Sequence, residues 1–475
     1  MTDVARPSAG STRHEMMDAA RGVAVLGILW LNIFLFALPF EAMVIPMIWG
    51  EHNVLNQAVW DFTTTSVSGV MRGMFSILFG ASAMLLLGRA ERAADQVAAI
   101  DRYFRRLIWL IVFGAVHAYL LLWPHDILYA YGLLGMLIFP FRHVATRRLV
   151  IVAVVMIIGS SVFTSQNVEE IGEARGVAEE TLSDEERERL RHDDPLVDEL
   201  DDYGGLRAVE PLLHLTGSAG TQAEAADEVT EEELDYEAFV ARLNEEIDER
   251  LEGYVANLLS LAPESFQQQT TEMIGNHLLD IGAFLLIGMV LFRTGFFFGD
   301  WAPRTYLRIA VGGYALGMAI GVVNAMDLAE DGVASAVGGF AAEYGFDVRR
   351  LALALANFSL VALLVGSGRF AVLRRSLAAC GRMALTLYVS QTIVCNTLFL
   401  GYGLSQFGQL EHYQLALTAL GLTVLQMLVA PLFLQRFAHG PLEHVLRKLV
   451  EWGRPNGPTQ SGSAPRRRTP VGQAT

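Results

Sequence analysis

Long apolar runs separated by short polar loops dominate the chain from end to end. A helix needs roughly 20 apolar residues to cross a hydrocarbon layer of about 30 Å. We predict ten membrane-spanning helices, the fourth and fifth of them short, over residues 21–40, 67–88, 107–123, 127–140, 149–163, 273–292, 306–326, 351–366, 383–401 and 413–435. The predicted fold is therefore an all-α, polytopic bundle of transmembrane helices in a lipid bilayer.

The placement of basic residues predicts the topology, because short cytoplasmic loops collect Lys and Arg. With the amino terminus inside, the inner segments hold 25 basic residues, whereas the short outer loops hold only Arg349 and Arg350. The first apolar run lacks a clear small-x-small cleavage site, so we interpret it as a retained helix rather than a secretory signal. We expect a multi-pass protein of the cell membrane with both termini in the cytoplasm.

A strongly acidic segment over residues 164–270 divides the chain. It holds 30 of the 51 Asp and Glu residues but only 7 of the 35 Lys and Arg residues. We predict a cytoplasmic tail (1–20), two five-span halves (21–163 and 271–452), this extracytoplasmic segment between them, and a disordered cytoplasmic tail (453–475). Apolar positions recur at three and four between Tyr236 and Leu258, which predicts a helix. The segment is either a cap over an outward-facing cavity or a solvated acidic face.

Composition excludes several classes of function. The net charge is −16 and the only lysine is Lys448, so nucleic-acid binding, a P-loop and an intramembrane Schiff-base lysine are all disfavoured. Cys380 and Cys395 are the only cysteines. On one helix they would lie about 22 Å apart, which predicts no disulfide and no thiolate metal site. HExxH, GxSxG and dinucleotide glycine motifs are absent from the sequence.

Histidine and aspartate concentrate at the outer end of the third span. His117 lies within the span, and His125 and Asp126 lie in the tight turn that follows. A histidine that titrates near neutrality beside a carboxylate suits general-base catalysis or a proton relay, so the candidate catalytic residues are His117, Asp126 and His125. The alternative is that His117 hydrogen-bonds a neighbouring carbonyl or Tyr119, and that Asp126 caps the next helix.

Other ionisable and polar residues within spans are candidates for binding, because they are costly in hydrocarbon. Arg21 and Arg382 lie near the cytoplasmic face, where Arg21 either binds a cofactor or extends to the interface. Asp280 needs a cation, and Arg72 at similar depth is its expected partner, as a structural salt bridge or an anion-binding group. Asn32 either lines a cavity or forms an interhelical hydrogen bond. The candidate substrate-binding residues are Asn32, Arg72, Asp280, Tyr388 and Gln391.

Six segments in a fixed order match a known family. They are DAARGVAVLGILWLNIFLF from Asp18, RGMFSILFGASAML from Arg72, RRLIWLIVFGAVHAYLLLWPHDILYAYGLLG from Arg105, GMVLFRTGFF from Gly288, GRMALTLYVSQTIVCNTLFLGYGL from Gly381 and GPLEHVLRKL from Gly440. The chain thereby resembles the YeiB-like membrane proteins, domain-of-unknown-function family 418. This resemblance implies a polytopic bacterial membrane protein with the named domain at about 290–452, and no settled activity. Its Asp-x-x-Arg-Gly helix is distantly similar to that of transmembrane acyltransferases, which modify sugars or surface polymers.

The resemblance also implies a set of shared positions, and the chain departs from the family at three others. The shared positions are Asp18, Arg21, Asn32, Arg72, His117, Asp126, Arg382, Tyr388 and Gln391. Ala20 stands where Leu is common, His125 where Gly usually precedes the Asp, and Leu387 where Asn usually precedes the Tyr. A polar role at position 387 is therefore disfavoured, and His125 adds a group that the resemblance does not imply.

These observations leave three hypotheses from different classes. The leading one is a membrane acyltransferase: acyl-CoA or another acyl donor binds near Arg21 and Arg382, His117 is the base, and an envelope glycan or lipid accepts the acyl group. The alternative is a proton-linked exporter or small-molecule carrier, whose relay consists of His117, Asp126, Asp280 and Arg72. The third is a structural or sensory membrane component without turnover.

Overall fold

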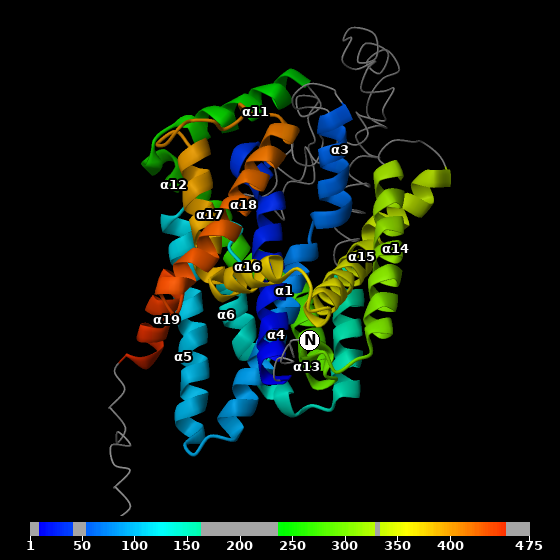
Figure 1. Ribbon diagram of the computed structural model, residues 1–475. Helices are drawn as coiled ribbons and strands as arrows, with labels where there is room; N and C mark the ends of the chain where they lie inside the picture. The colour runs from blue at the N-terminus through cyan, green and yellow to red at the C-terminus, as the bar shows by residue number, and fades with distance from the viewer. Residues whose placement is uncertain (1–8, 41–53, 163–235, 328–332, 453–475) are drawn as a thin grey trace, which may run out of the picture.

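The computed structural model describes residues 9–40, 54–162, 236–327 and 333–452. Every regular element in these ranges is helical, which confirms the all-α fold. The first half contains α1 (Ala9–Ala37), α3 (Val54–Phe62), α4 (Val70–Glu91), α5 (Gln96–Ala115), α6 (Leu128–Leu137) and a helix over 146–162. α1 therefore begins twelve residues before the predicted first span at 21, inside the predicted tail. Figure 1 shows α1 and α4 in the interior of the bundle.

Two helices precede residue 271. α11 (Tyr236–Leu251) lies across one end of the bundle (Figure 1), and α12 (Tyr254–Gln269) begins the candidate membrane span Tyr254–Arg293. The remaining helices are α13 (Leu278–Arg293), α14 (Pro303–Asp327), α15 (Val333–Gly366), α16 (Ala371–Arg382), α17 (Ala384–Phe399), α18 (His412–Arg436) and α19 (Pro441–Glu451). One extensive apolar core runs through both halves.

Seven helices in the described ranges are long and apolar enough to cross a membrane, or eight if α16 and α17, bent by 81°, form one broken span. The prediction of ten differs at the fourth and fifth spans. α6 has 10 residues and rises about 15 Å, half the thickness of the hydrocarbon layer, and the helix that begins at residue 146 is described only as far as residue 162. The apolar helices indicate a membrane protein.

The predicted helix across Tyr236 to Leu258 is interrupted. α11 ends at Leu251 and α12 starts at Tyr254, so Glu252 and Gly253 separate them. Gly401 packs at this break, where its N–H donates to the Arg250 carbonyl at 2.9 Å. The predicted acidic segment up to residue 235 and the predicted disordered tail 453–475 lie outside the described residues.

Glycines allow two helix pairs to pack backbone against backbone. In the α4–α13 pair, a Cβ on Gly80 would clash with the Leu285 carbonyl, and one on Gly288 with the Ile77 carbonyl. In the α1–α16 pair, a Cβ on Gly22 or Gly381 would meet the carbonyl of the facing helix. Small residues are the usual means of close approach between membrane helices, and here they fix the relative positions of helices from both halves.

Within the described ranges, three helices contain a π-helical turn, which has one more residue than a regular turn. These turns are η2 (Thr63–Val67), η3 (Val116–Leu120) and η6 (Met273–His277). His117 lies in η3 and His277 in η6. Because π-turns are frequent at functional sites, their positions direct attention to these histidines. The two cysteines, Cys380 and Cys395, are both free and buried.

We predict that Gly381→Ala destabilises the protein by about 1–3 kcal/mol, because the added methyl group meets the Asp18 carbonyl and the backbone of α1. Gly421→Ala in α18 is the matched control, since a Cβ there meets open space. Thermal unfolding of both variants in detergent tests this. Equal melting temperatures for the two variants would contradict the predicted close contact.

Candidate functional site

His117 is the centre of a buried group of polar side chains. The His117 side chain is itself only 1% exposed. Its Nδ1 lies 2.7 Å from Oδ1 of Asp126, and its Nε2 lies 2.8 Å from Oγ1 of Thr392. The predicted association of His117 with Asp126 is therefore confirmed. The alternative partners expected for His117, a neighbouring carbonyl or Tyr119, are replaced by Asp126 and Thr392.

Asp126 both orients the histidine and caps a helix. Its Oδ2 accepts the backbone N–H of Tyr129 at 2.8 Å, near the start of α6. Gly114 makes this arrangement possible, since a Cβ at that position would press on the Asp126 carboxylate and the Tyr129 backbone. Each carboxylate oxygen of Asp126 therefore has its own partner, His117 for Oδ1 and the Tyr129 backbone for Oδ2.

The two partners of His117 assign its neutral tautomer. When Asp126 is ionised and His117 is neutral, the carboxylate can only accept; Nδ1 then carries the proton and the lone pair on Nε2 accepts the Thr392 hydroxyl proton. A histidine held in this way by a carboxylate presents its second nitrogen as a base toward a hydroxyl group. The geometry suits abstraction of a proton from an alcohol.

Aromatic rings enclose this group on one side. The Tyr388 ring contacts the His117 ring at 4.9 Å, and its hydroxyl accepts the Trp123 indole N–H at 3.1 Å. Trp123 stacks on Phe36 of α1 at 3.8 Å. We call His117, Asp126, Thr392, Tyr388 and Trp123 the histidine site. Its residues come from η3, the turn before α6, and α17.

His125 borders the histidine site through its ring, which meets the Trp123 ring edge-on at 5.5 Å between centroids. Its Nε2 lies 3.2 Å from Oε1 of Glu264 on α12, and both side chains are about one-third exposed. Asp126 is turned inward to His117 and the α6 backbone, so the preceding residue points toward α12 instead. His125 therefore connects the histidine side of the bundle to α12, and its catalytic role stays a prediction.

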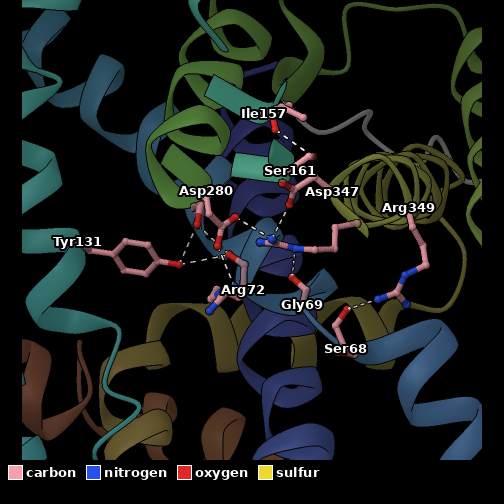
Figure 2. A network of polar contacts seen from close by, with 11 residues as sticks. Ser68, Gly69, Arg72, Tyr131, Ile157, Ser161, Asp280, Asp347 and Arg349 are labelled. Atoms are coloured by element: carbon pink, nitrogen blue, oxygen red, sulfur yellow. Dashed lines mark hydrogen bonds and ion pairs between the residues drawn. The ribbon is translucent and has the colours of Figure 1, made fainter. Parts of the chain in front are cut away.

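A second polar group surrounds Asp280 in the interior (Figure 2). Arg72 lies 2.8 Å from Oδ2 of Asp280, which confirms the predicted ion pair. Arg350 lies 2.7 Å from Oδ1 of Asp280 and 2.7 Å from Asp347. We call Arg72, Asp280, Asp347 and Arg350 the charge network. Asp280 and Arg350 are each 1% exposed, so each charge depends on the others.

The predicted location of Arg349 and Arg350 in an outer loop is wrong. They lie within α15 and are buried. Arg349 donates to the carbonyls of Thr64 and Thr65 at 2.6 Å and of Ser68 at 3.1 Å, at and just after the π-turn η2. The i, i+3 spacing of Asp347 and Arg350 directly before an apolar run was the available signal for this burial.

Tyr131 hydrogen-bonds the backbone of Arg72, a member of the charge network. Its hydroxyl donates to the Arg72 carbonyl at 3.2 Å and lies 3.1 Å from the Ser76 hydroxyl, which itself bonds the same carbonyl. Tyr131 belongs to α6, the helix that Asp126 precedes. The histidine site and the charge network thus share α6 as a common support.

Arg21 forms a third polar group, near the junction of α16 and α17. It pairs with Asp18 at 3.0 Å and contacts the Ser82 hydroxyl at 3.3 Å and the Gly381 carbonyl at 3.5 Å. Arg106, absent from the sequence-based candidates, lies within electrostatic range of Arg21, Arg447 and Glu443. Arg382 is exposed at the end of α16.

The remaining predicted residues are buried, and one has a clear packing role. Gln391 donates to the Val25 carbonyl at 2.9 Å and to Gln426 at 3.0 Å, so it joins α17 to α1 and α18. Asn32 is buried in α1, 9% exposed. Tyr388 alone among the predicted substrate-binding residues contacts His117.

Comparison with known proteins gives a family domain and full-length relatives. Residues 291–453 match the family described as protein of unknown function DUF418. The chain is 27% identical over 467 residues to the "Uncharacterized protein YeiB" of Escherichia coli (strain K12), covering 92% of this chain and 96% of the relative. It is 23% identical over 453 residues to the "Uncharacterized protein YxaH" of Bacillus subtilis (strain 168), covering 93% and 95%.

The predicted resemblance to the YeiB-like proteins is thus confirmed. No solved structure matches the chain. The matched region, residues 291–453, supplies Thr392 and Tyr388 to the histidine site and Arg350 and Asp347 to the charge network, whereas His117, Asp126, Arg72 and Asp280 precede it. Both polar groups therefore require the chain on each side of the domain boundary.

We predict that Asp280→Asn lowers stability by about 3–5 kcal/mol, because it removes a buried carboxylate from between Arg72 and Arg350. The control is Asp101→Asn, whose partner Arg105 lies at a similar distance, 3.0 Å, in an exposed pair. There we expect a loss below about 1 kcal/mol. Melting temperatures in detergent measure both, and similar shifts would contradict a dominant role for burial.

Proposed function

We propose that this membrane protein transfers acyl groups to a cell-envelope glycan or lipid, with His117 as the general base. The observation that carries the proposal is the buried chain of contacts from Asp126 through His117 to a hydroxyl group. Acyl transfer to an alcohol needs a base that removes the hydroxyl proton and returns a proton to the leaving group. The assigned tautomer of His117 meets this need.

The donor is an acyl thioester such as acyl-CoA, and its phosphate groups meet Arg21 and Arg106. Arg21 contacts the Gly381 carbonyl beside the start of α17, and Thr392 lies eight residues beyond Ala384 on the same helix. Eight helical residues rise about 12 Å. An extended thioester arm that follows α17 would cover this depth, with its charged end among arginines and its acyl end at His117.

The acceptor approaches from the side of α12. Tyr254 on α12 donates to the Leu120 carbonyl at 2.9 Å, in the same π-turn that holds His117. His125 and Glu264 meet at this side with partly exposed side chains. Under the predicted topology this end faces outward, where hydroxyl groups of envelope glycans and lipids are available as acceptors.

We predict that His117→Gln and Asp126→Asn each lower acyl transfer by roughly 10²-fold or more, because base catalysis contributes about that much. The measurement is the transfer of label from radiolabelled acetyl coenzyme A to lipid and glycan fractions in membrane vesicles. His143→Gln is the control, since His143 is 64% exposed and faces Glu91. An unchanged rate in His117→Gln would refute this role.

The charge network favours a second candidate, a proton-linked carrier. Asp280 and Asp347 are buried carboxylates among arginines, and intramembrane ionisable chains are characteristic of proton relays. As in the relay predicted from sequence, His117 and Asp126 would exchange protons alongside Arg72 and Asp280.

The carrier hypothesis predicts that wild-type protein in vesicles speeds the collapse of an imposed pH gradient and that His117→Gln does not. A pH-sensitive dye inside the vesicles measures this, with protein-free vesicles as the control. A gradient that wild-type protein leaves unchanged, together with acetyl transfer that depends on His117, would reject the carrier and support the enzyme.

A further inference from the structure

Thr392, His117 and Asp126 form a connected row of a hydroxyl, an imidazole and a carboxylate. Oγ1 of Thr392 lies 2.8 Å from Nε2 of His117, whose Nδ1 is held by Asp126 at 2.7 Å. A hydroxyl, a histidine and a carboxylate in this order characterise enzymes that form covalent acyl intermediates. Thr392 is 1% exposed, so the hydroxyl is directed at the histidine and removed from bulk water.

We propose that Thr392 is the nucleophile that first receives the acyl group, so that transfer proceeds in two steps through an acyl-threonine ester. This inference rests on the proposed acyl transfer and specifies its path. The substrate class is an acyl thioester, and the acceptor hydroxyl enters only after the thiol has formed.

In the first step, the Thr392 hydroxyl gives its proton to Nε2 of His117 and its oxygen bonds to the acyl carbon. The carbon–sulfur bond breaks, and sulfur leaves with the electron pair. His117 returns the proton to the sulfur, which gives a free thiol and an ester on Thr392. The Asp126 carboxylate stabilises the imidazolium that exists between these two proton transfers.

In the second step, the acceptor hydroxyl gives its proton to Nε2 and its oxygen bonds to the same acyl carbon. The ester bond to Thr392 breaks, and Oγ1 recovers a proton from His117. The sum is a thioester and an alcohol converted to a thiol and an ester. No oxidant, reductant or further reactant is needed.

The surroundings hold Thr392 in place from both sides along α17. Gln391 is bonded to the Val25 carbonyl and to Gln426, and Asn396 donates to the Leu121 carbonyl at 2.6 Å. These contacts fix the rotation and height of α17 relative to α1 and the end of η3. A catalytic group needs such support because small displacements lose the productive geometry. The buried position also protects an ester from water.

The simpler role for Thr392 is to hold His117 in one tautomer without reacting. Both roles predict weaker transfer when the hydroxyl is removed, so activity alone does not separate them. Only the nucleophile acquires the acyl group itself. The deciding measurement is therefore a covalent adduct on Thr392 in the wild-type protein.

Purified full-length protein in detergent is incubated with radiolabelled acetyl coenzyme A without acceptor, quenched in acid, and its peptides are analysed by mass spectrometry. We expect one acetyl group on the peptide that contains Thr392. Thr392→Ser should keep the adduct, because the hydroxyl remains. Thr392→Val should lack it and lose roughly 10²-fold or more of the transfer rate. Thr397→Val on the exposed side of α17 is the matched control and should keep both.

The outcomes separate this inference from the proposed function. If the wild-type protein transfers acetyl groups and depends on His117, but carries no adduct and tolerates Thr392→Val, the nucleophile assignment is overturned and acyl transfer stands. If the wild-type protein transfers no acetyl group, both are overturned. The wild-type adduct decides the question even if Thr392→Val fails to fold, which its thermal unfolding in detergent would reveal.

Discussion

A charge inside an apolar helix bundle must find its partner within the protein, and this constraint organises the structure. Asp280 shows it most directly, because the carboxylate lies between Arg72 and Arg350 and is almost completely buried. Removing one partner would leave the others without compensation in a medium that solvates charge poorly. The helices that supply these side chains, α4, α13 and α15, therefore have little freedom to shift separately.

The polar side chains of the interior, which need partners within the protein, gather in three groups along the bundle. Arg21 lies beside the start of α17, Thr392 in the middle of that helix meets His117, and the charge network is built on α4, α13 and α15. α17 connects the first two groups, and α6 supports the last two through Asp126 and Tyr131. Each group therefore combines side chains from both halves of the chain.

The sequence predicted those contacts whose residues are either close together in the chain or of a charged type that is rare in apolar spans. His117 and Asp126 are nine residues apart, and a lone arginine and aspartate in apolar spans, Arg72 and Asp280, have few other partners. Thr392 could not be predicted in this way, because it is 275 residues from His117 and threonine is an ordinary residue in a membrane helix. Rules for loop charge also misassigned Arg350, since they count arginines near span ends without regard to burial.

The π-turns have a consequence for how the helices present their faces. Each adds one residue, so everything after it is turned by about 100° relative to an uninterrupted α-helix. In the helix that ends with η3, the exposed apolar side chains of Ile108 and Val112 precede the turn, and His117 within the turn faces Thr392 of α17. The irregular turn thus coincides with the point where this helix passes from an exposed apolar face to a buried polar contact.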